Sequence, residues 1–278
     1  RQEEFLAVLA GDPLSAAQHP EWWLRRLQHS WPQDWLGIVA AGNGPPPMAL
    51  RVNRRRCGRD DYCARLAAEG VAATPVGEDG LALERPLPVD KLPGFADGLV
   101  SVQDPGAQMA APLIDPKPGS RVLDACAAPG GKAAHLLERA DLDLLALDLK
   151  PARCRRVVEN FARLGLAATV MAADCTQLAR WWDGRPFDAV LADVPCTASG
   201  VVRRNPDAKW LRRETDIDSF AAAQAGILEA LWQVVRPGGK LLYATCSVFP
   251  EENSTQIGCF LASRPEARRA HEEQILPT

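Results

Sequence analysis

The strongest indication of the fold is the segment Arg121-Val-Leu-Asp-Ala-Cys-Ala-Ala-Pro-Gly-Gly-Lys132. Residues 121–126 form a short apolar run that is typical of a buried strand. The proline and glycines that follow predict a tight turn, and the residues through Arg139 have the pattern of a helix. A strand, a Gly-rich turn and a helix in this order are the opening unit of a parallel α/β sheet.

Further strand and helix patterns follow at the spacing of such a sheet. Pro151 opens a predicted helix that stops at Gly165, and a later helix starts near Phe220 and is expected to end at Pro237-Gly238-Gly239. Because strands and helices alternate, the sequence predicts a doubly wound, Rossmann-like sheet in an α/β fold. The remaining strands are expected over residues 142–148, 168–173, 187–193 and 240–246.

Two smaller segments precede the sheet. Residues 1–44 look helical, and we interpret their tryptophans 22, 23, 31 and 35 as packing anchors rather than as a base-stacking surface. A proline-rich linker, Asn43-Gly44-Pro45-Pro46-Pro47, leads into a small α+β module over residues 45–110, with a strand at Met48–Val52 and a helix over 60–69. Residues 111–278 would then form the catalytic domain.

The composition is that of an ordinary globular protein. Of 278 residues, 47% are hydrophobic and the formal net charge is −3, which excludes collagen-like, low-complexity and broadly disordered classes. No apolar run approaches the roughly 18 residues that a membrane span needs. Any site for a polyanion must be a local patch. Because the sequence starts at Arg1 without a signal-peptide pattern, we expect part of a longer cytoplasmic protein.

Eight cysteines are compatible with disulfides, metal ligands or reduced thiols. No C-x-x-C pair is present, and the four histidines do not cluster near the cysteines. This pattern favours reduced thiols in a cytosolic protein without a metal site.

Acidic residues follow three of the predicted strands. Asp148, Asp174 and Asp193 stand at strand ends, where ligands bind in parallel sheets, together with the turn at residues 127–132. Each acid alone could simply cap a helix. Three acids beside a Gly-rich turn indicate a nucleoside ligand without a triphosphate, because the acids would repel phosphates. S-adenosylmethionine contains adenosine and carries a positive charge, so it fits such a site.

Two cysteines follow the last two predicted strands. Buried cysteines are usually small apolar fillers, but Cys196 and Cys246 follow strands into the ligand region, where a thiolate can act as a nucleophile. A thiolate beside a methyl donor suits the C5 carbon of cytosine, which becomes nucleophilic only after a thiolate adds to C6. Asp193 could then stabilise the ring protonated at N3.

Three motifs resemble the signatures of RNA cytosine-C5 methyltransferases: Asp124 to Lys132, Asp193-Val-Pro-Cys196 and Tyr243-Ala-Thr-Cys-Ser247. Val102 to Gln108 and Ser199 to Trp210 narrow the likeness to the bacterial 16S ribosomal RNA enzymes of the Sun/Fmu type. The resemblance covers about residues 45–262 and departs at both ends. Those enzymes carry a C-terminal strand rich in Gly and Phe, for which the polar residues before Thr278 show no counterpart, so this edge of the sheet is expected to be incomplete. They also carry an N-terminal helical RNA-binding domain, and residues 1–44 look like the end of that domain or the linker from it.

The resemblance implies roles that the residues alone leave open. Cys246 would attack C6 and Cys196 would help release the product, whereas DNA cytosine methyltransferases attack from the Pro-Cys position. Asp148 would bind the ribose of S-adenosylmethionine, Asp174 would lie near the adenine, and Asp193 would close the site. The turn that holds the donor would comprise Cys126, Ala127, Ala128, Pro129, Gly130, Gly131 and Lys132.

The implied partner is 16S ribosomal RNA, naked or in a partly assembled small subunit, bound by a monomer without membrane or metal. Transfer RNA is the rival substrate. An RNA-binding or assembly factor with a vestigial donor pocket is a different class, and the missing G-x-G-x-x-G disfavours a nicotinamide dehydrogenase. The residues expected to contact RNA are Arg51, Arg54, Arg55, Arg56, Arg203, Arg204 and Lys209.

Overall fold

The computed structural model describes residue 4 and residues 16–277, and the chain divides into two compact units. The sheet unit comprises Pro47–Val194 and Gly226–Ala244, and the loop unit comprises the chain up to Pro46, Pro195–Ala225 and the chain from Thr245. The loop unit therefore joins segments from all along the sequence. In the described part, no helix has both the length and the apolar character that crossing a membrane requires.

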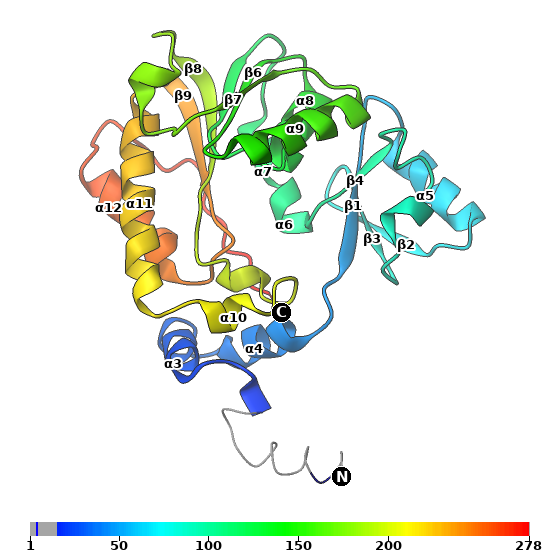
Figure 1. Ribbon diagram of the computed structural model, residues 1–278, viewed down its shortest axis with the longest axis horizontal. Helices are drawn as coiled ribbons and strands as arrows, with labels where there is room; N and C mark the ends of the chain where they lie inside the picture. Colours follow the sequence, from blue (N-terminus) through cyan, green and yellow to red (C-terminus); the bar gives the residue numbers. More distant parts are fainter. Residues whose placement is uncertain (1–3, 5–15, 278) are drawn as a thin grey trace. The chain divides into compact units, whose positions relative to one another are not determined.

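The sheet unit contains a five-stranded parallel sheet in the order β7-β6-β5-β8-β9 (Figure 1). Alternate residues of a strand face opposite sides: Val122 packs under α8 and α9, while Leu123 packs with Ile227 of α11 on the other face. Helices on both faces confirm the predicted doubly wound fold. The elements are β5 (Arg121–Asp124), α8 (Gly131–Arg139), β6 (Asp143–Asp148), α9 (Pro151–Leu164), β7 (Thr169–Ala172), η2 (Leu178–Arg180), β8 (Phe187–Asp193), α11 (Thr215–Trp232) and β9 (Val235–Ala244).

The ends of two helices test the sequence signals directly. Pro151 is the first residue of α9 and Gly165 caps its end with φ of 70°, as predicted. The expected helix end at Pro237 is wrong, because α11 ends at Trp232 and Val235 already pairs with Phe187 in β9. Residues 236–239 form an irregularity in the pairing, which an edge strand tolerates better than a central one.

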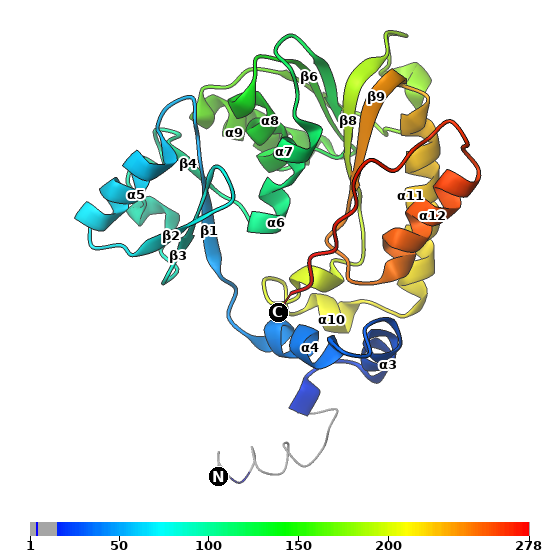
Figure 2. The same cartoon turned by 180° about the vertical axis from the view of Figure 1, so that it is seen from behind.

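A second sheet in the same unit is four-stranded and antiparallel, in the order β2-β3-β1-β4 (Figure 2). Helix α5 packs on it through Tyr62 and Leu66, which are fully buried against Leu50, Leu81 and Val100. This is the predicted α+β module. Its elements are β1 (Met48–Val52), α5 (Arg59–Ala68), β2 (Ala73–Val76), β3 (Gly80–Leu83), η1 (Val89–Lys91) and β4 (Val100–Val102), followed by α6 (Pro105–Gln108) and α7 (Ala110–Ile114).

The loop unit has its own apolar core, in which the N-terminal tryptophans are packing residues, as expected. Trp23 is 1% exposed and lies against Phe249 and Ile217. The indole of Trp31 donates a hydrogen bond to the carbonyl of Val248 at 2.8 Å. The helical pattern at residues 5–9 lies outside the described residues. The elements are α3 (Glu21–Ser30), α4 (Trp35–Asn43), η3 (Ser199–Val201), α10 (Ala208–Leu211), η4 (Pro250–Glu252) and α12 (Ser254–Ala262), with the first part of α11.

Candidate active site

The Gly-rich turn after β5 is held tightly by backbone contacts. The amide of Ala127 donates to the carbonyl of Leu147 at 2.7 Å, and the amide of Ala128 donates to the Asp148 carboxylate at 3.2 Å. Gly130 has φ of 98°, and a Cβ at this position would lie 3.1 Å from Val157 of α9. Glycine is therefore required there, and the turn leads directly into the N-terminus of α8.

Three carboxylates and one lysine gather at the carboxyl ends of the strands in the sheet unit. Asp124 and Asp148, the last residues of β5 and β6, are buried. Asp193 ends β8 and forms an ion pair with Lys132 of the turn, with Nζ and Oδ2 2.6 Å apart. A fourth carboxylate, Asp174, is not at a strand end: it lies two residues beyond β7 and accepts hydrogen bonds from the amide and hydroxyl of Thr176. The strand order changes direction between β5 and β8, which is where ligands bind in such sheets.

The charge of this cluster fits a cationic nucleoside. One oxygen of Asp124, Oδ2, is buried without a hydrogen-bond partner. Burial and the neighbouring Asp193 charge raise the pKa of the Asp124 carboxyl to about 7, while Lys132 opposes this rise. A ligand that brings positive charge and hydroxyl groups would relieve this repulsion, whereas a polyphosphate would increase it. The carboxylates and the turn at the strand ends therefore fit S-adenosylmethionine as the ligand. The sequence prediction missed Asp124, although it ends a strand as Asp148 and Asp193 do.

The raised pKa of Asp124 predicts a specific pH dependence of stability. Its folded value of about 7 lies above the ordinary 3.8, so between these values the folded chain holds a proton that the unfolded chain has lost. Stability from this group is complete below pH 4 and is lost as the pH rises through 7. At about 1.4 kcal/mol per pH unit, the free energy of unfolding should fall by about 2 kcal/mol between pH 5.5 and 7.

The variant Asp124→Asn should lack this decrease in the free energy of unfolding between pH 5.5 and 7, that is, this slope of stability against pH. Urea unfolding at both pH values measures it. Glu159→Gln, which changes an exposed carboxyl on α9, is the control and should keep the slope of the wild type. Equal slopes in wild type and Asp124→Asn would contradict the assignment.

Two pairs of thiols are present among the eight free cysteines. In the turn, Cys126 is hydrogen-bonded to Cys175, and this contact together with burial raises the pKa of Cys126. Cys126 therefore keeps its proton and lines the turn without acting as a nucleophile. Cys175 is a partner that the sequence did not indicate. In the described part of the chain, no group of three or more His, Cys, Asp or Glu side chains could hold a metal ion.

The second pair lies in the loop unit and is asymmetric. The sulfur atoms of Cys196 and Cys246 are 3.3 Å apart, with Cys196 buried and Cys246 exposed. The contact with Cys246 and burial raise the pKa of Cys196. Cys196 therefore holds its proton and can donate it to the sulfur of Cys246. The two residues follow Asp193 and Ala244 by three and two positions, and those strand ends are paired with each other in β8 and β9.

Two of the residues expected to contact RNA are not available for it. Arg51 is fully buried, and its guanidinium donates to both oxygens of Glu138 at 2.7 and 2.8 Å and to the carbonyl of Gly131 at 2.6 Å. Lys209 is buried and donates to the side chain of Asn43 at 2.7 Å, and burial lowers its pKa. The prediction that these two cations bind phosphates is wrong, because their charges are directed into the protein.

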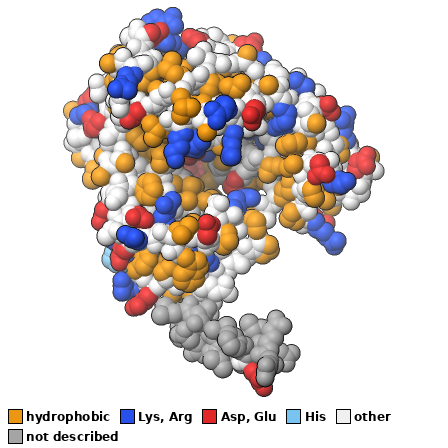
Figure 3. Space-filling model, in the orientation of Figure 1, with side chains coloured by type: hydrophobic (Ala, Val, Ile, Leu, Met, Phe, Trp, Pro, Cys, Tyr) orange, Lys and Arg blue, Asp and Glu red, His pale blue; other side chains and the backbone are white. Residues whose placement is uncertain are grey.

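The other basic residues remain accessible. Arg54 and Arg55 are exposed, and they form ion pairs with the buried Asp79 and the exposed Asp141, respectively. The exposed Arg56 donates to two backbone carbonyls. Arg203 and Arg204 are half-buried in the loop unit. Figure 3 also shows Lys and Arg side chains over α9, which the sequence prediction did not include.

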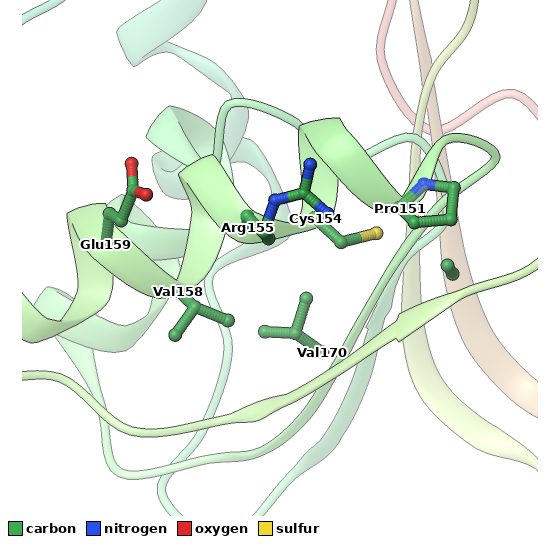
Figure 4. Close-up of a pocket in the computed structure, with 7 residues that line it drawn as sticks. Pro151, Cys154, Arg155, Val158, Glu159 and Val170 are labelled. Atoms are coloured by element: carbon green, nitrogen blue, oxygen red, sulfur yellow. The ribbon is translucent and has the colours of Figure 1, made fainter.

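One open hollow lies away from the predicted site. It has a volume of about 390 Å³ and lies between α9 and the edge strand β7 (Figure 4). None of the predicted site residues lines it. Its lining comprises Pro151, Cys154, Arg155, Val158, Glu159, Val170 and Ala172.

A parallel sheet with a Gly-rich turn after its first strand and acids at the strand ends is the architecture of the S-adenosylmethionine-dependent methyltransferase fold class. Comparison with known protein families narrows this fold class to one family. Residues 111–275 match the family described as 16S rRNA methyltransferase RsmB/F, and residues 19–90 match the ferredoxin-like domain of RsmF/B-like methyltransferases. The chain belongs to the 16S rRNA methyltransferase RsmB/F family.

Individual relatives agree with this family. The chain is 49% identical over 270 residues to ribosomal RNA small subunit methyltransferase B of Pseudomonas putida, covering 96% of this chain and 62% of that protein. The crystal structure of PH0851 is similar with a TM-score of 0.87 at 28% identity, covering 95% of this chain and 63% of that one. A methyltransferase homologue from Pyrococcus horikoshii has a TM-score of 0.79 at 30% identity, covering 90% and 80% of the two chains.

Proposed function

We propose that the protein methylates C5 of a cytosine in 16S ribosomal RNA through a covalent adduct between a cysteine and C6 of the base. The observation that carries this proposal is the thiol pair, in which the sulfur of the exposed Cys246 lies 3.3 Å from the sulfur of the buried Cys196. A nucleophile must reach the base, and of the two thiols in this pair Cys246 is the exposed one. The names of the curated relatives support ribosomal RNA of the small subunit as the substrate. The chain spans 60 to 63% of the length of these relatives.

The chemistry follows from the poor nucleophilicity of C5 in cytosine. Cys246, as a thiolate, forms a bond to C6 and moves electron density to C5. When bound, S-adenosylmethionine supplies an electrophilic methyl group. After C5 has taken this methyl, a base accepts the proton on C5, the electrons of that C–H bond restore the C5–C6 double bond, and the sulfur of Cys246 leaves C6. Cys196 holds the proton beside the departing sulfur and assists release, and Asp193 stabilises the ring protonated at N3.

The sheet unit would hold the donor. We assign the turn from Cys126 to Lys132 to the donor, with Asp148 accepting hydrogen bonds from the ribose hydroxyls. Asp174 would lie near the adenine. The ion pair with Lys132 orients the Asp193 carboxylate at the end of β8. Asp124 adds negative charge that favours a cationic ligand.

The RNA would be bound by the basic residues that stay accessible. Arg54, Arg55 and Arg56 in the small module and Arg203 and Arg204 in the loop unit can contact backbone phosphates. The target base must leave its stack to meet the thiol, which is easiest for an unpaired cytosine.

Methyl transfer tests the proposal directly. The intact protein is incubated with labelled S-adenosylmethionine and one of three substrates: a 16S transcript, partly assembled small subunits or transfer RNA. We expect label in the 16S transcript and in the small subunits, and none in transfer RNA. Bisulfite sequencing should then place the methyl at C5 of one cytosine. Methylation of transfer RNA alone would change the substrate, and methylation at another atom would overturn the mechanism.

A further inference from the structure

One buried carboxylate in the loop unit contacts both segments that carry the thiols. Glu252 ends η4 and is fully buried. Its Oε1 accepts from the backbone amide of Thr197 at 2.9 Å, and its Oε2 accepts from the Thr197 and Ser247 hydroxyls, each at 2.5 Å. Thr197 directly follows Cys196, and Ser247 directly follows Cys246. A single side chain therefore connects the two thiol segments.

A third segment joins at the same oxygen. The side-chain amide of Gln224 in α11 donates to Oε1 of Glu252 at 3.1 Å and to the carbonyl of Pro195 at 2.9 Å. Pro195 is the residue before Cys196, so the Cys196 segment is held on both sides of the thiol. Buried charges are costly unless hydrogen bonds satisfy them, and these donors meet that requirement.

Hydroxyl groups extend the network along the Cys246 segment. The Ser199 hydroxyl lies 2.9 Å from that of Ser247 and accepts from the amide of Val248 at 2.9 Å. The amide of Gly200 donates to the carbonyl of Cys246 itself at 2.8 Å, and a Cβ on Gly200 would lie 3.0 Å from that oxygen. The two segments are thus fixed to each other by backbone and side-chain bonds that converge on Glu252.

We infer that Glu252 is a positioning residue that holds Cys196 and Cys246 in contact by binding the residue after each thiol. The negative charge of Glu252 also disfavours a thiolate at the nearby Cys196, which agrees with its role as the proton-bearing member of the pair. The inference rests on the proposed function for its catalytic meaning, whereas the geometry of the two thiols can be measured without RNA.

The test compares Glu252→Gln with Glu251→Gln in the intact protein. Glu251 is the neighbouring residue, and its half-buried carboxylate pairs with Arg26 rather than with either thiol segment. The first readout is the rate at which the oxidant diamide joins Cys196 to Cys246, which depends on the contact of the sulfurs and needs no RNA. The second is the single-turnover rate of adduct formation on RNA containing 5-fluorocytidine. The third is the affinity for S-adenosylmethionine.

We expect Glu252→Gln to slow both disulfide formation and adduct formation by about tenfold or more, with the affinity for the donor unchanged. Glu251→Gln should stay within about twofold of the wild type in all three. Equal disulfide rates in the two variants would overturn the inference. Absence of any adduct with the wild type would instead overturn the proposed cytosine chemistry, and the disulfide rates would still decide the role of Glu252.

A second variant covers the case in which Glu252→Gln does not fold. Thr197→Val removes one hydroxyl donor and leaves the carboxylate in place. Thr197→Val should slow disulfide formation and adduct formation by about threefold each. Unchanged rates would count against the positioning role of Glu252.

Discussion

Replacing Cys246 with alanine is expected to abolish the covalent trapping of RNA that contains 5-fluorocytidine, with a loss on the order of 10³-fold or more. Fluorine at C5 cannot leave as a proton does, so a nucleophile that has added to C6 stays attached. Cys246 is the exposed member of the pair and therefore the thiol that a base can reach. The measurement is the fraction of protein shifted to the RNA adduct on a denaturing gel.

Cys196→Ala should still trap this RNA, because the buried thiol acts in release. It should also accumulate adduct on ordinary cytidine RNA in the presence of S-adenosylmethionine. Cys259→Ala, which removes another exposed thiol, is the matched control and should behave as the wild type. Loss of trapping in Cys196→Ala alone would exchange the two roles.

Replacing Arg51 with methionine should lower the free energy of unfolding by roughly 3 to 5 kcal/mol. The guanidinium is fully buried against Glu138, whose side chain is 1% exposed, so its loss leaves an unpaired buried charge. Burial already raises the pKa of Glu138, and Arg51 opposes this rise. Urea unfolding of the purified variant measures the effect.

The double variant Arg51→Met with Glu138→Met is the control, because replacing both charges with apolar side chains is often close to neutral. It should recover most of the lost stability. If Arg51→Met alone unfolds like the wild type but binds RNA more weakly, the result would contradict this prediction and support a phosphate-binding role for Arg51. Arg54→Met should weaken RNA binding and its salt dependence without a comparable loss of stability.

Much of the sheet could be predicted because its signals are local. The apolar run at residues 187–193, the proline at residue 151 and the glycine at residue 165 each act on their own neighbourhood, and β8 and α9 have the expected bounds. The prediction failed at residues 233–239, where Pro237 and the two glycines look like the stop of a helix. They lie in β9, because pairing with β8 outweighs the local preference.

The ends of β6 and β8, the Gly-rich turn and the motifs that carry the two thiols could be predicted, since they depend on residues close together in the chain. The burial of polar groups and their contacts could not be predicted in the same way, because both depend on the folded chain. Arg51 and Lys209 look like surface cations in the sequence, but partners 87 and 166 positions away hold them inside. The same holds for the two thiols, of which Cys246 is exposed and Cys196 is buried, and for the contacts of Glu252 with the residue after each of them. Burial and hydrogen bonding depend on segments that meet only in the folded chain.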